Sequence, residues 1–515
     1  MTDLQLDTLE ARGLIRIASF QPELEYLFRH ALLQDTAYES LLKQERKVLH
    51  QVVGETLEDL YPERLGELAA ILAMHFEHAG ETDKAIRYLA SAAAFASERN
   101  AIVEAFDLYG RAAALLPERP ESGDDPYRRQ RVEINLGRAK SGFTFMSEDD
   151  ALAMIDPIMD DARATGDLRL EADVHLASAL LRQFMRESPD TSPLLQASLA
   201  RVAEIAKELN DPLIAAMPDS IVGLYRVFTG DLQAGVEILQ RTAPQLAQKQ
   251  DFVGSSFALV ALAIGYARLG EFDKADKAAR NASELAEKGD VIARLDSLIA
   301  ESTVRSVRGN LEEAVPLAMR CTNLAEESGA IACVVASNFI LGEAYMRQGN
   351  FEDARIALER GNEVSKAIRD RQFRPSIAAY MRANAASVGE LTPDIDSFEE
   401  ALALSRETGD RFGEANVRWK RAETEATKQP DVRNGWQMWS DFELATAGFE
   451  TMGARPYLAR SLHAWGRALR DAGDMDAGDA KLRQALGLFA ELGITREAAE
   501  VTAELAGASG GLSLN

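Results

Sequence analysis

The 515-residue sequence predicts an all-α fold, a solenoid of stacked helix pairs, and three observations favour it. One turn motif recurs at intervals of 39 and 40 residues, and such self-similarity is typical of stacked repeats. A second series of glycines divides each interval. Aromatic residues make up only 7% of a chain rich in helix-forming residues. The motif copies are Gly270-Glu271-Phe272-Asp273-Lys274-Ala275, Gly309-Asn310-Leu311-Glu312-Glu313-Ala314 and Gly349-Asn350-Phe351-Glu352-Asp353-Ala354.

The second glycine series predicts a second turn in each repeat, and hence two helices per repeat. Weaker copies of the first turn lie at Gly230 and Gly389, one interval before and after the three clear copies. A chain of this length is too long for one compact core, which favours a one-dimensional stack. The second series comprises Gly289, Gly329, Gly409, Gly453 and Gly493, with Arg369 in the place of a glycine.

The first sixty residues have a different pattern. Residues 4–12 are predicted to form a short helix, and residues 14–19 and 24–28 two strands on either side of a proline-containing turn. Two helices are expected at 31–43 and 46–60. A helix, a two-stranded wing and a further helix correspond to the closing half of a winged-helix domain.

One segment of this region resembles a known family. It reads Phe28-Arg29-His30-Ala31-Leu32-Leu33-Gln34-Asp35-Thr36-Ala37-Tyr38-Glu39-Ser40-Leu41-Leu42, and the stretch from Leu72 to Ala85 continues the match. Both resemble the region after the nucleotide-binding core of bacterial STAND-type ATPases, notably adenylate/guanylate cyclase-like proteins. The resemblance implies a vestigial nucleotide-sensing role for Arg29 and His30, with simple packing as the alternative for His30.

The catalytic parts of that family are not found in this sequence. No phosphate-binding Gly-x-x-x-x-Gly-Lys-Ser/Thr loop occurs, and the cyclase domain is absent too. The specific resemblance covers residues 1–117. Beyond them the likeness is one of repeats only, and it is shared with maltose-regulator-like transcriptional activators. The chain is therefore expected to be the C-terminal part of such a protein, as a separate gene or a truncated product.

Small residues within the repeat predict close helix packing. Gly342 and Ala354 allow two antiparallel helices to approach, and Tyr345 fills the space beside them. Gly349 is expected to end the first helix in a left-handed conformation, which is cheap for glycine. Asn350 is then placed to cap the second helix.

This pattern resembles the tetratricopeptide repeat, whose second helix is matched best by Ala105, Tyr109, Ala112 and Pro117. That repeat is about 34 residues long, so the longer interval here predicts longer helices. The resemblance implies a right-handed superhelix in which the first helices line a concave face. That face is the expected binding surface.

Four arginines near the turn glycines form a candidate binding ladder: Arg268, Arg308, Arg347 and Arg470. Guanidinium groups at such a spacing can hold carboxylates or phosphates with two hydrogen bonds each. The alternative is that cations near helix C-termini offset the helix dipole, which stabilises by about 0.3–1 kcal/mol each.

All four tryptophans lie in one part of the chain. They are Trp419, Trp436, Trp439 and Trp465, and they fall in a repeat stretched to 44 residues between Gly409 and Gly453. They are candidates for an interface anchor. Large core side chains in an irregular repeat are the alternative.

The sequence predicts five segments. Residues 1–60 are the winged-helix remnant, 61–117 the first tetratricopeptide-like repeats and 118–126 a polar linker with prolines. Residues 127–505 continue the superhelical solenoid, and 506–515 form a flexible tail.

Composition limits the partners and the compartment. A net charge of −25 argues against nucleic acid, because phosphate binding needs a basic surface. No apolar run reaches the length of about 18 residues that a membrane span needs. The N-terminus, Met1-Thr2-Asp3-Leu4, has no basic region or apolar core of a signal peptide. The only two cysteines, Cys321 and Cys333, are too few for a disulfide framework. A cytoplasmic protein is expected.

Catalytic and metal-binding patterns are also missing. His75 and His78 are spaced to share a metal on one helix face, but no third ligand lies nearby in sequence, so packing is favoured. Cys321 and Cys333 are expected to be buried thiols. No Gly-x-Ser-x-Gly elbow occurs. The chain is therefore expected to be no enzyme and to need no cofactor.

Three functions remain. The first is a non-catalytic sensor or scaffold arm of a bacterial signalling system that binds a protein or peptide in its groove. The second is the regulatory half of a split or truncated ATPase–nucleotide cyclase, with the catalytic polypeptide as partner. The third is a small-ligand receptor like those of transcription regulators. The oligomeric state is left open.

Overall fold

The structure is a computed structural model that describes residues 3–19, 25–120, 124–248, 252–389, 397–427 and 436–507. The secondary structure of the described residues consists of helices and one two-stranded hairpin, which confirms the predicted fold class. The chain divides into two compact units, one of Met1–Phe95 with Asp107–Glu118 and one of Ala96–Phe106 with Arg119–Asn515. Each unit is described by itself.

The first unit contains the predicted hairpin, in which β1 pairs antiparallel with β2 and Ile15 lies opposite Phe28. Helix α2 ends at Glu39, earlier than the predicted 43, because α3 begins at Lys43 with its own cap: the Glu45 carboxylate accepts the Leu42 N–H (2.9 Å). The division between the units crosses α5 and α6. The elements are α1 (Asp3–Ala11), β1 (Ile15–Ser19), β2 (Glu25–Phe28), α2 (Ala31–Glu39), α3 (Lys43–Leu60), the 3-10 helix η1 (Pro62–Arg64), α4 (Leu65–Ala79), α5 (Thr82–Glu98) and α6 (Ile102–Leu115).

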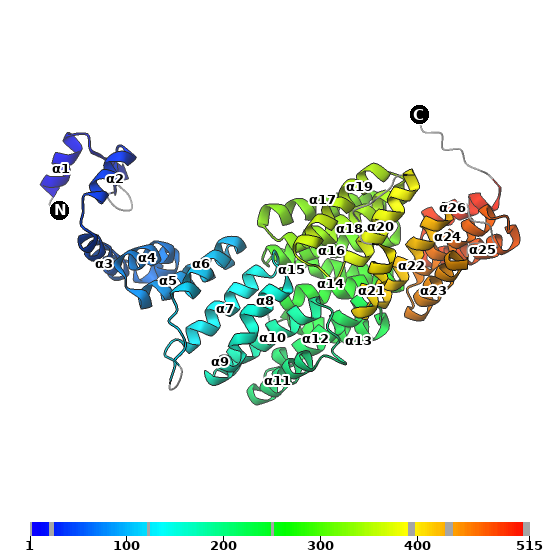
Figure 1. The fold of residues 1–515 in the computed structure, drawn as a ribbon, viewed down its shortest axis with the longest axis horizontal. Helices are drawn as coiled ribbons and strands as arrows, with labels where there is room; N and C mark the ends of the chain where they lie inside the picture. The colour runs from blue at the N-terminus through cyan, green and yellow to red at the C-terminus, as the bar shows by residue number, and fades with distance from the viewer. Residues whose placement is uncertain are drawn as a thin grey trace. The chain divides into compact units, whose positions relative to one another are not determined.

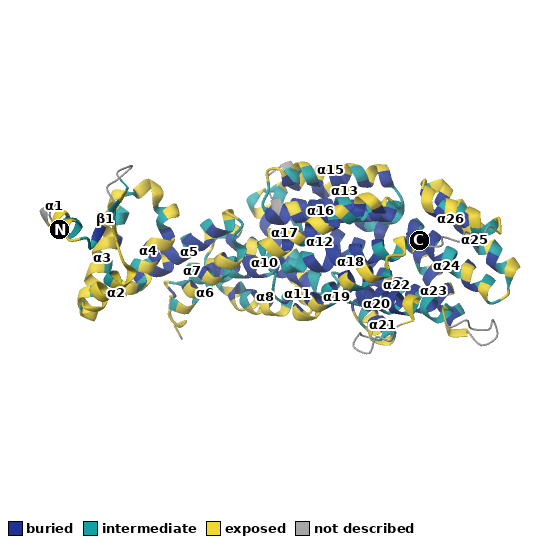
Figure 2. Ribbon diagram, turned by 90° about the horizontal axis from the view of Figure 1, so that it is seen from above, coloured by how far each residue is buried: buried dark blue, intermediate teal, exposed yellow. Residues whose placement is uncertain are grey.

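Helix α3 packs on α4 with one side only. The Phe76 ring is fully buried against Gly54, where a Cβ would lie 2.8 Å from the ring. On its other side, Val48, Leu49 and Val52 are each about half exposed, at 50%, 49% and 52%. Figure 2 shows α2 and α3 largely in the colour of exposed residues. This unit therefore leaves a row of apolar side chains uncovered.

The second unit is the stack of helix pairs drawn from cyan to red in Figure 1. Most of its helices are 15 to 18 residues long. They are α7 (Arg128–Gly142), α8 (Glu148–Ile155), η2 (Asp156–Ile158), α9 (Met159–Ala164), α10 (Leu168–Phe184), α11 (Pro193–Leu209), α12 (Pro212–Thr229), α13 (Leu232–Gln248), α14 (Phe252–Leu269), α15 (Phe272–Ala286), α16 (Val291–Arg308), α17 (Leu311–Ser328), α18 (Ile331–Gln348), α19 (Phe351–Ala367), α20 (Arg374–Val388), α21 (Phe398–Glu407), α22 (Arg411–Ala426), α23 (Trp436–Met452), α24 (Arg455–Asp471), α25 (Met475–Leu492) and α26 (Thr495–Leu505).

The repeat turns have the geometry that the sequence predicts. Gly270, Gly309 and Gly349 end α14, α16 and α18 with φ of +83°, +96° and +77°, values that favour glycine. Asn350 Oδ1 accepts the Asp353 N–H (3.5 Å), which confirms the predicted cap of α19. In the second series Arg369 does adopt a left-handed φ of +55°. Gly289 is not among the left-handed glycines.

The helices form an inner and an outer layer. The inner layer consists of the first helices of the repeats, such as α14, α16 and α18, which are buried along most of their length. Outer helices such as α15 are buried on one face, mostly by alanine. Figure 2 shows this difference between α15 and α16. Gly342 of α18 allows Leu358 of α19 to approach so closely that a Cβ would lie 2.5 Å from Leu358 Cδ2.

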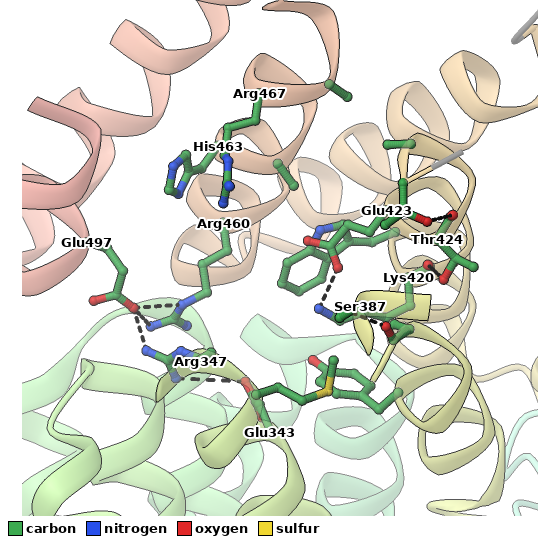
Figure 3. Close-up of a pocket in the computed structure, with 18 of the residues that line it drawn as sticks. Glu343, Arg347, Ser387, Lys420, Glu423, Thr424, Arg460, His463, Arg467 and Glu497 are labelled. Atoms are coloured by element: carbon green, nitrogen blue, oxygen red, sulfur yellow. Dashed lines mark hydrogen bonds and ion pairs between the residues drawn. The ribbon is translucent and has the colours of Figure 1, made fainter. Parts of the chain in front are cut away.

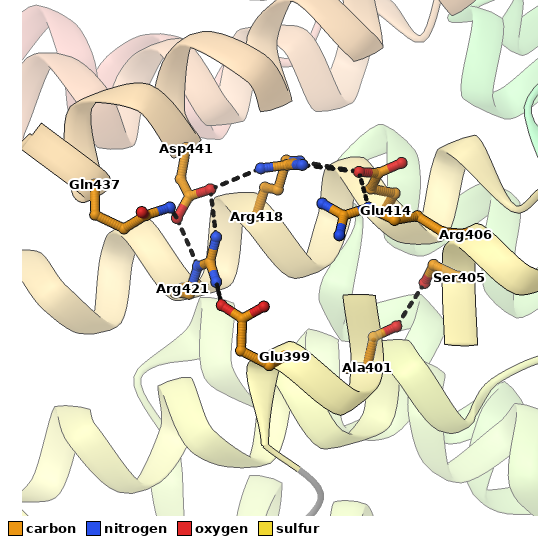
Figure 4. Close-up of polar contacts among 9 residues, drawn as sticks. All are labelled: Glu399, Ala401, Ser405, Arg406, Glu414, Arg418, Arg421, Gln437 and Asp441. Carbon is orange, nitrogen blue, oxygen red and sulfur yellow. Dashed lines mark hydrogen bonds and ion pairs between the residues drawn. The ribbon is translucent and has the colours of Figure 1, made fainter. Parts of the chain in front are cut away.

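A buried acid holds together the irregular region α21–α23 (Figure 4). Asp441 of α23 is fully buried and accepts hydrogen bonds from Arg421 Nε (2.6 Å) and Arg418 Nη1 (3.0 Å) of α22. Arg421 also pairs with Glu399 of α21. Because a buried carboxylate is stable only when paired, these contacts tie the three helices to one another.

Candidate binding site inside the solenoid

The inner helices of distant repeats face and contact one another. Helix α12 packs against α22, and α14 against α24. The guanidinium of Arg268, at the end of α14, lies 3.7 Å from the centroid of the Phe412 ring in α22. The solenoid therefore winds far enough to close on itself, and the expected concave groove is divided into separate chambers.

One cavity of the second unit, here called the C-terminal chamber, has a volume of about 460 Å³. It lies between α18, α20, α22, α24 and α26, and Figure 3 shows side chains of these helices converging on it. Four aromatic residues and several charged ones line it. Those used below are Glu343, Arg347, Tyr380, Ser387, Trp419, Lys420, Glu423, Thr424, Phe442, Arg460, His463 and Glu497.

A buried ion network forms one wall of this chamber. Glu497 of α26 lies between Arg347 of α18 and Arg460 of α24 (Figure 3), and Arg460 Nη2 is 2.9 Å from Glu497 Oε1. Arg460 also donates to the carbonyl of Val307 (2.7 Å). Burial would raise the pKa of Glu497, but Arg460 and Arg347 lower it to about 2. The network holds the C-terminal helix against the middle of the solenoid.

The opposite wall combines a cation with aromatic rings. Lys420 Nζ lies 3.8 Å from the Trp419 ring centroid and 4.5 Å from that of Tyr380, and it pairs with Glu423 (2.8 Å). Such cation–π contacts hold the ammonium group in place. This wall therefore offers a flat apolar surface beside fixed charges.

Several polar atoms of the chamber have no hydrogen-bond partner among the described residues. They are Glu343 Oε1, Trp419 Nε1, Arg460 Nη1 and Glu497 Oε2, and all four are buried. Buried donors and acceptors are normally satisfied by protein, water or ligand. The chamber can therefore bind a polar group through both donors and acceptors.

A smaller cavity of about 60 Å³ adjoins this chamber at Glu343. The guanidinium groups of Arg186 and Arg268 line it, and burial lowers the pKa of both. Arg186 adopts a left-handed φ of +65° after α10, which turns its side chain over the Phe228 ring at 5.3 Å. Asp410 is the acid whose charge acts most strongly on Arg186. The interior thus carries charge well beyond the C-terminal chamber.

The four arginines of the predicted ladder do not all make the same contacts. Arg268 and Arg347 line the interior, and each donates to a backbone carbonyl 41 residues earlier, Val227 O at 3.0 Å and Ser306 O at 2.6 Å. Those carbonyls belong to the last turns of α12 and α16. Cations there offset the dipole of the preceding inner helix.

The other two ladder members make different contacts. Arg308 pairs with Asp276 (2.5 Å) and lies over the Phe272 ring, both on the outer helix α15. Arg470 donates to the carbonyl of Glu504 (2.9 Å). The four arginines therefore do not converge on one site, and a binding role for them as a set stays a prediction.

The four tryptophans lie in different environments. Trp419 is buried, and Trp465 stacks on Phe442 with ring centroids 6.1 Å apart. Trp439 is partly buried in the same core, whereas Trp436 is 74% exposed. Three of them thus have the packing role raised as the alternative, and an interface role remains a prediction that suits Trp436 best.

In the first unit, a third histidine joins the pair that the sequence singled out. His50 Nδ1 lies 2.9 Å from His75 Nδ1, and the His50 ring stacks on His78 at 4.7 Å. Burial, followed by the charge of His78, lowers the pKa of His75. Among the described side chains, no group of three or more histidine, cysteine, aspartate or glutamate residues is arranged to hold a metal ion.

The residues implied by the family resemblance lie at the surface. Arg29 and His30 are both exposed, and His30 is the residue before α2. His30 is therefore not packed in a core, contrary to the alternative reading, and the sensing role stays a prediction. Of the cysteines, Cys321 is buried as expected, whereas Cys333 is only partly buried.

The sequence did not point to the acids and two of the arginines of the interior. Arg186, Glu343, Arg460 and Glu497 lie outside the turn motif. Arg347 and Glu497 are 150 residues apart, so only the winding of the solenoid brings them together. A charged residue at an inner-helix position otherwise held by apolar side chains is the one signal that could have marked Glu343.

No described helix has the length and apolarity required to cross a membrane.

Comparison with known proteins supports the fold and leaves the family open. No family model matches the sequence. A curated, uncharacterized protein of Rhizobium meliloti (strain 1021) is 26% identical over 157 residues, which is 30% of this chain. The chain spans only 15% of that relative's length.

Three solved structures show similar helical stacks. A Rap protein complexed with Competence and Sporulation Factor has a TM-score of 0.53 at 12% identity, covering 71% of this chain and 99% of that one. The aspartyl phosphate phosphatase F of Bacillus subtilis has a TM-score of 0.42 at 13% identity, covering 71% and 95%. Yeast Tom70 has a TM-score of 0.30 at 12% identity, covering 88% and 98%. The chain therefore has a tetratricopeptide-like helical repeat fold similar to that of the Rap protein.

Proposed function

We propose that this chain is a non-catalytic binding arm of a signalling system, which holds a segment of a protein or peptide inside its solenoid. The C-terminal chamber carries this proposal. It combines a volume of about 460 Å³, aromatic surface and buried polar atoms that lack partners within the described chain. Concave sites with apolar walls and a few fixed polar groups are typical of ligand binding.

The solved Rap protein supports the proposal at the level of fold. That protein is complexed with Competence and Sporulation Factor, and its helical stack is similar to that of this chain. A fold that holds a partner in one protein can hold one in another, although the partner depends on the side chains present.

Obstruction of the chamber tests this function. Ser387 and Thr424 line it, and their replacement by tryptophan fills the space with a bulky ring. We expect S387W and T424W to lose the partner that the intact chain retains from native lysate, as measured by quantitative mass spectrometry.

The matched control is Ile356→Trp on the outer helix α19, where the side chain is 53% exposed. It should retain the partner like the intact chain. Equal capture by all three variants, with unchanged circular dichroism, would contradict binding in the chamber.

A second candidate is the regulatory half of a split or truncated ATPase–nucleotide cyclase. The observation in its favour is the uncovered apolar row of α3, because contiguous exposed apolar side chains mark interaction sites. The far greater length of the Rhizobium meliloti relative also leaves room for further domains in such proteins. In this reading the first unit docks on the catalytic polypeptide.

Capture of an ATP-binding polypeptide tests the second candidate. The chain alone is expected neither to hydrolyse ATP nor to form cyclic nucleotide. If it serves such an enzyme, the polypeptides that it captures from native lysate should include one that binds ATP-agarose. The V48E/V52E double variant should no longer capture that polypeptide. If the intact chain captures no ATP-binding polypeptide, this candidate function is contradicted.

A small-ligand receptor is the third possibility. It needs a pocket with apolar walls, and the second unit has one of about 280 Å³ between α7, α10 and α12–α14. We call it the apolar chamber. Tryptophan at Met217, which lines it, should then abolish the response to the ligand while S387W leaves that response unchanged.

A further inference from the structure

A third chamber, near the start of the solenoid, is walled by phenylalanine rings. It has a volume of about 130 Å³, and we call it the aromatic chamber. Phe143 follows α7, Phe184 ends α10 and Phe257 belongs to α14. Their ring centroids lie 5.6 to 6.5 Å apart, and all three rings are partly exposed to the hollow. Three helices thus present aromatic surface to one space.

Two carboxyl groups line the same chamber without a basic partner. Asp296 of α16 is 4% exposed, and Ser256 Oγ donates to its Oδ2 at 2.7 Å. Glu148 begins α8 and is only partly exposed. Within the described chain, neither group forms an ion pair with lysine or arginine. Burial raises the pKa of each to about 7.

A hydroxyl group of this chamber also lacks a partner. Thr144 is 3% exposed, and its Oγ1 makes no hydrogen bond within the described structure. The backbone holds it in place, because Thr144 O accepts the N–H of Ala332 (2.7 Å) at the start of α18. The loop after α7 is therefore fixed with an unused acceptor at the chamber.

Two arginines lie near these acids, and neither forms an ion pair with Glu148 or Asp296 among the described residues. Arg186 lies over the Phe228 ring, with Asp410 as its main opposite charge. Arg371 pairs with Glu407 at 3.1 Å. The third acid of the chamber, Asp370, accepts the N–H groups of residues 372, 373 and 374 at 3.0, 3.0 and 3.1 Å. Arg371 and Arg186 interact with Glu148 through their charge alone, without an ion pair, and no lysine or arginine is among the groups that shift the pKa of Asp296.

The aromatic chamber continues into the apolar chamber. The two share Phe143, Leu181, Leu224 and Phe257 as walls. Aliphatic side chains line the remainder of the apolar chamber, and Lys140 and Asp173 form a pair at 4.0 Å beside them. The combined space has acids and aromatic rings at one end and an aliphatic channel at the other.

We propose that the aromatic chamber binds an organic cation, an alkylammonium or guanidinium group, and that the apolar chamber takes the chain attached to it. A cation would neutralise the buried carboxylates, and aromatic faces attract cations. The net charge of −25 raises the local concentration of cations. The inference rests on the proposed function in so far as the cation is a lysine or arginine side chain of the partner, and a free amine is the other source.

Calorimetry on the full chain with n-hexylammonium chloride and 1-hexanol tests this. The two probes have the same alkyl chain and differ in charge. We expect hexylammonium to bind about tenfold more tightly or better. In D296N and in E148Q its affinity should fall towards that of hexanol, and in the control R467A, in the C-terminal chamber, it should not change. Equal affinities for the two probes, or a cation affinity untouched by both carboxyl variants, would overturn the proposal.

Further measurements distinguish a peptide side chain from a free amine as the source of the cation. They also distinguish failure of this inference from failure of the proposed function. An acetylated, amidated peptide with one lysine among leucines should bind more tightly than hexylammonium if the natural ligand is a peptide, and less tightly if it is a free amine. F257L keeps the acids but removes a ring, so it should weaken the binding of hexylammonium more than that of hexanol. If S387W and T424W still capture the partner from lysate while the natural chain binds hexylammonium, the proposed function is contradicted and the cation site is not.

Discussion

Charged side chains buried inside the solenoid are its most costly residues. Transfer of an ionised group from water into a protein interior is unfavourable unless a partner compensates it. The interior solves this in two ways. Glu497 sits between two guanidinium groups, whereas Asp296 has only a hydroxyl. The first arrangement stabilises the fold, whereas the second leaves Asp296 without a basic partner among the described residues.

Replacement of Asp296 by asparagine should therefore stabilise the folded protein at neutral and higher pH. Burial raises the pKa of Asp296 in the folded state to about 7, above the ordinary aspartate pKa of 3.8, so the folded state favours the protonated form. The stability from that form is complete below pH 3.8 and is lost as the pH rises through 7. At pH 8 we expect D296N to unfold with a free energy about 1–3 kcal/mol higher than the natural chain. Urea denaturation at pH 5 and pH 8 measures this.

The gain should shrink as the pH falls towards 4, where the natural carboxyl group is protonated in the folded state. D107N, at an exposed position in the middle of α6, serves as the control for a change of net charge. A lower stability of D296N at pH 8 would show that the carboxylate is compensated within the fold.

At the residue scale, the sequence identified some interior side chains and missed the rest. The spacing of the turn glycines marked Arg268 and Arg347, and both do line the interior. It also marked Arg308, which pairs with the outer helix instead. Sequence spacing gives the level of a residue along the helix but not the neighbour across the solenoid. Asp296 and the three phenylalanines of the aromatic chamber carried no pattern at all.

At the scale of elements, the unit of construction is a pair of helices joined at a left-handed glycine. Inner and outer helices alternate, and small residues set how closely they approach. Gly342 permits the contact between α18 and α19, whereas Gly487 on α25 has open space where a Cβ would lie. Both glycines are inside helices, so they separate the effect of packing from that of helix propensity.

Alanine at these two positions should have opposite effects. G342A places a methyl group against the buried Leu358, and we expect a loss of about 1–3 kcal/mol in the free energy of unfolding. G487A adds no contact and restricts the unfolded chain, so it should gain up to about 1 kcal/mol. Urea titration followed by circular dichroism measures both. A neutral G342A would show that α18 and α19 are less closely packed than described.

The elements were the part of the fold that the sequence predicted best. Turn glycines, the cap by Asn350 and the hairpin all follow from local rules that a short segment obeys by itself. The end of α2 was wrong by four residues, because a second cap at Leu42 competes with continuation of the helix. Gly289 lies in the expected turn between α15 and α16, although without a left-handed φ.

At the scale of the second unit, the solenoid is closed by contacts between repeats far apart in the chain. The ends of the inner helices α12, α14 and α16 meet later repeats. A Cβ on Gly309, for instance, would lie 2.9 Å from Glu497 Oε2. Repeat proteins are ordinarily stabilised by contacts between neighbours alone. Here α26 in addition joins α18 to α24 through the ion pairs of Glu497 with Arg347 and Arg460. A repeat period in the sequence cannot reveal such a contact.

Glu497→Ala should open this closure. It leaves Arg347 and Arg460 buried with a lost partner, at a cost of about 3 kcal/mol. Hydrogen exchange should then show lost protection in α24 and α26. The control is E500A, because Glu500 forms an exposed pair with Arg496 in the same helix, and such pairs contribute about 0.5 kcal/mol or less. Equal hydrogen-exchange protection of α24 and α26 in E497A and E500A would contradict the claim that Glu497 holds these helices together.

The same network predicts a pH dependence of opposite direction to that of Asp296. Arg460 and Arg347 lower the pKa of Glu497 in the folded state to about 2, from the ordinary glutamate pKa of 4.5. Its stabilising contribution is therefore complete above pH 4.5 and is lost as the pH falls towards 2. Between pH 6 and pH 4 the loss of protection in E497A relative to the natural chain should begin to shrink.

Site-specific photo-crosslinking tests the central claim most directly, namely that a partner is held inside the solenoid. A benzophenone amino acid is placed in the full chain at Thr424, inside the C-terminal chamber, or at Ile356 on the outer helix α19. After irradiation in native lysate, the account predicts one dominant adduct from position 424 and none from 356. The same adduct from both positions, or an adduct from 356 alone, would contradict it.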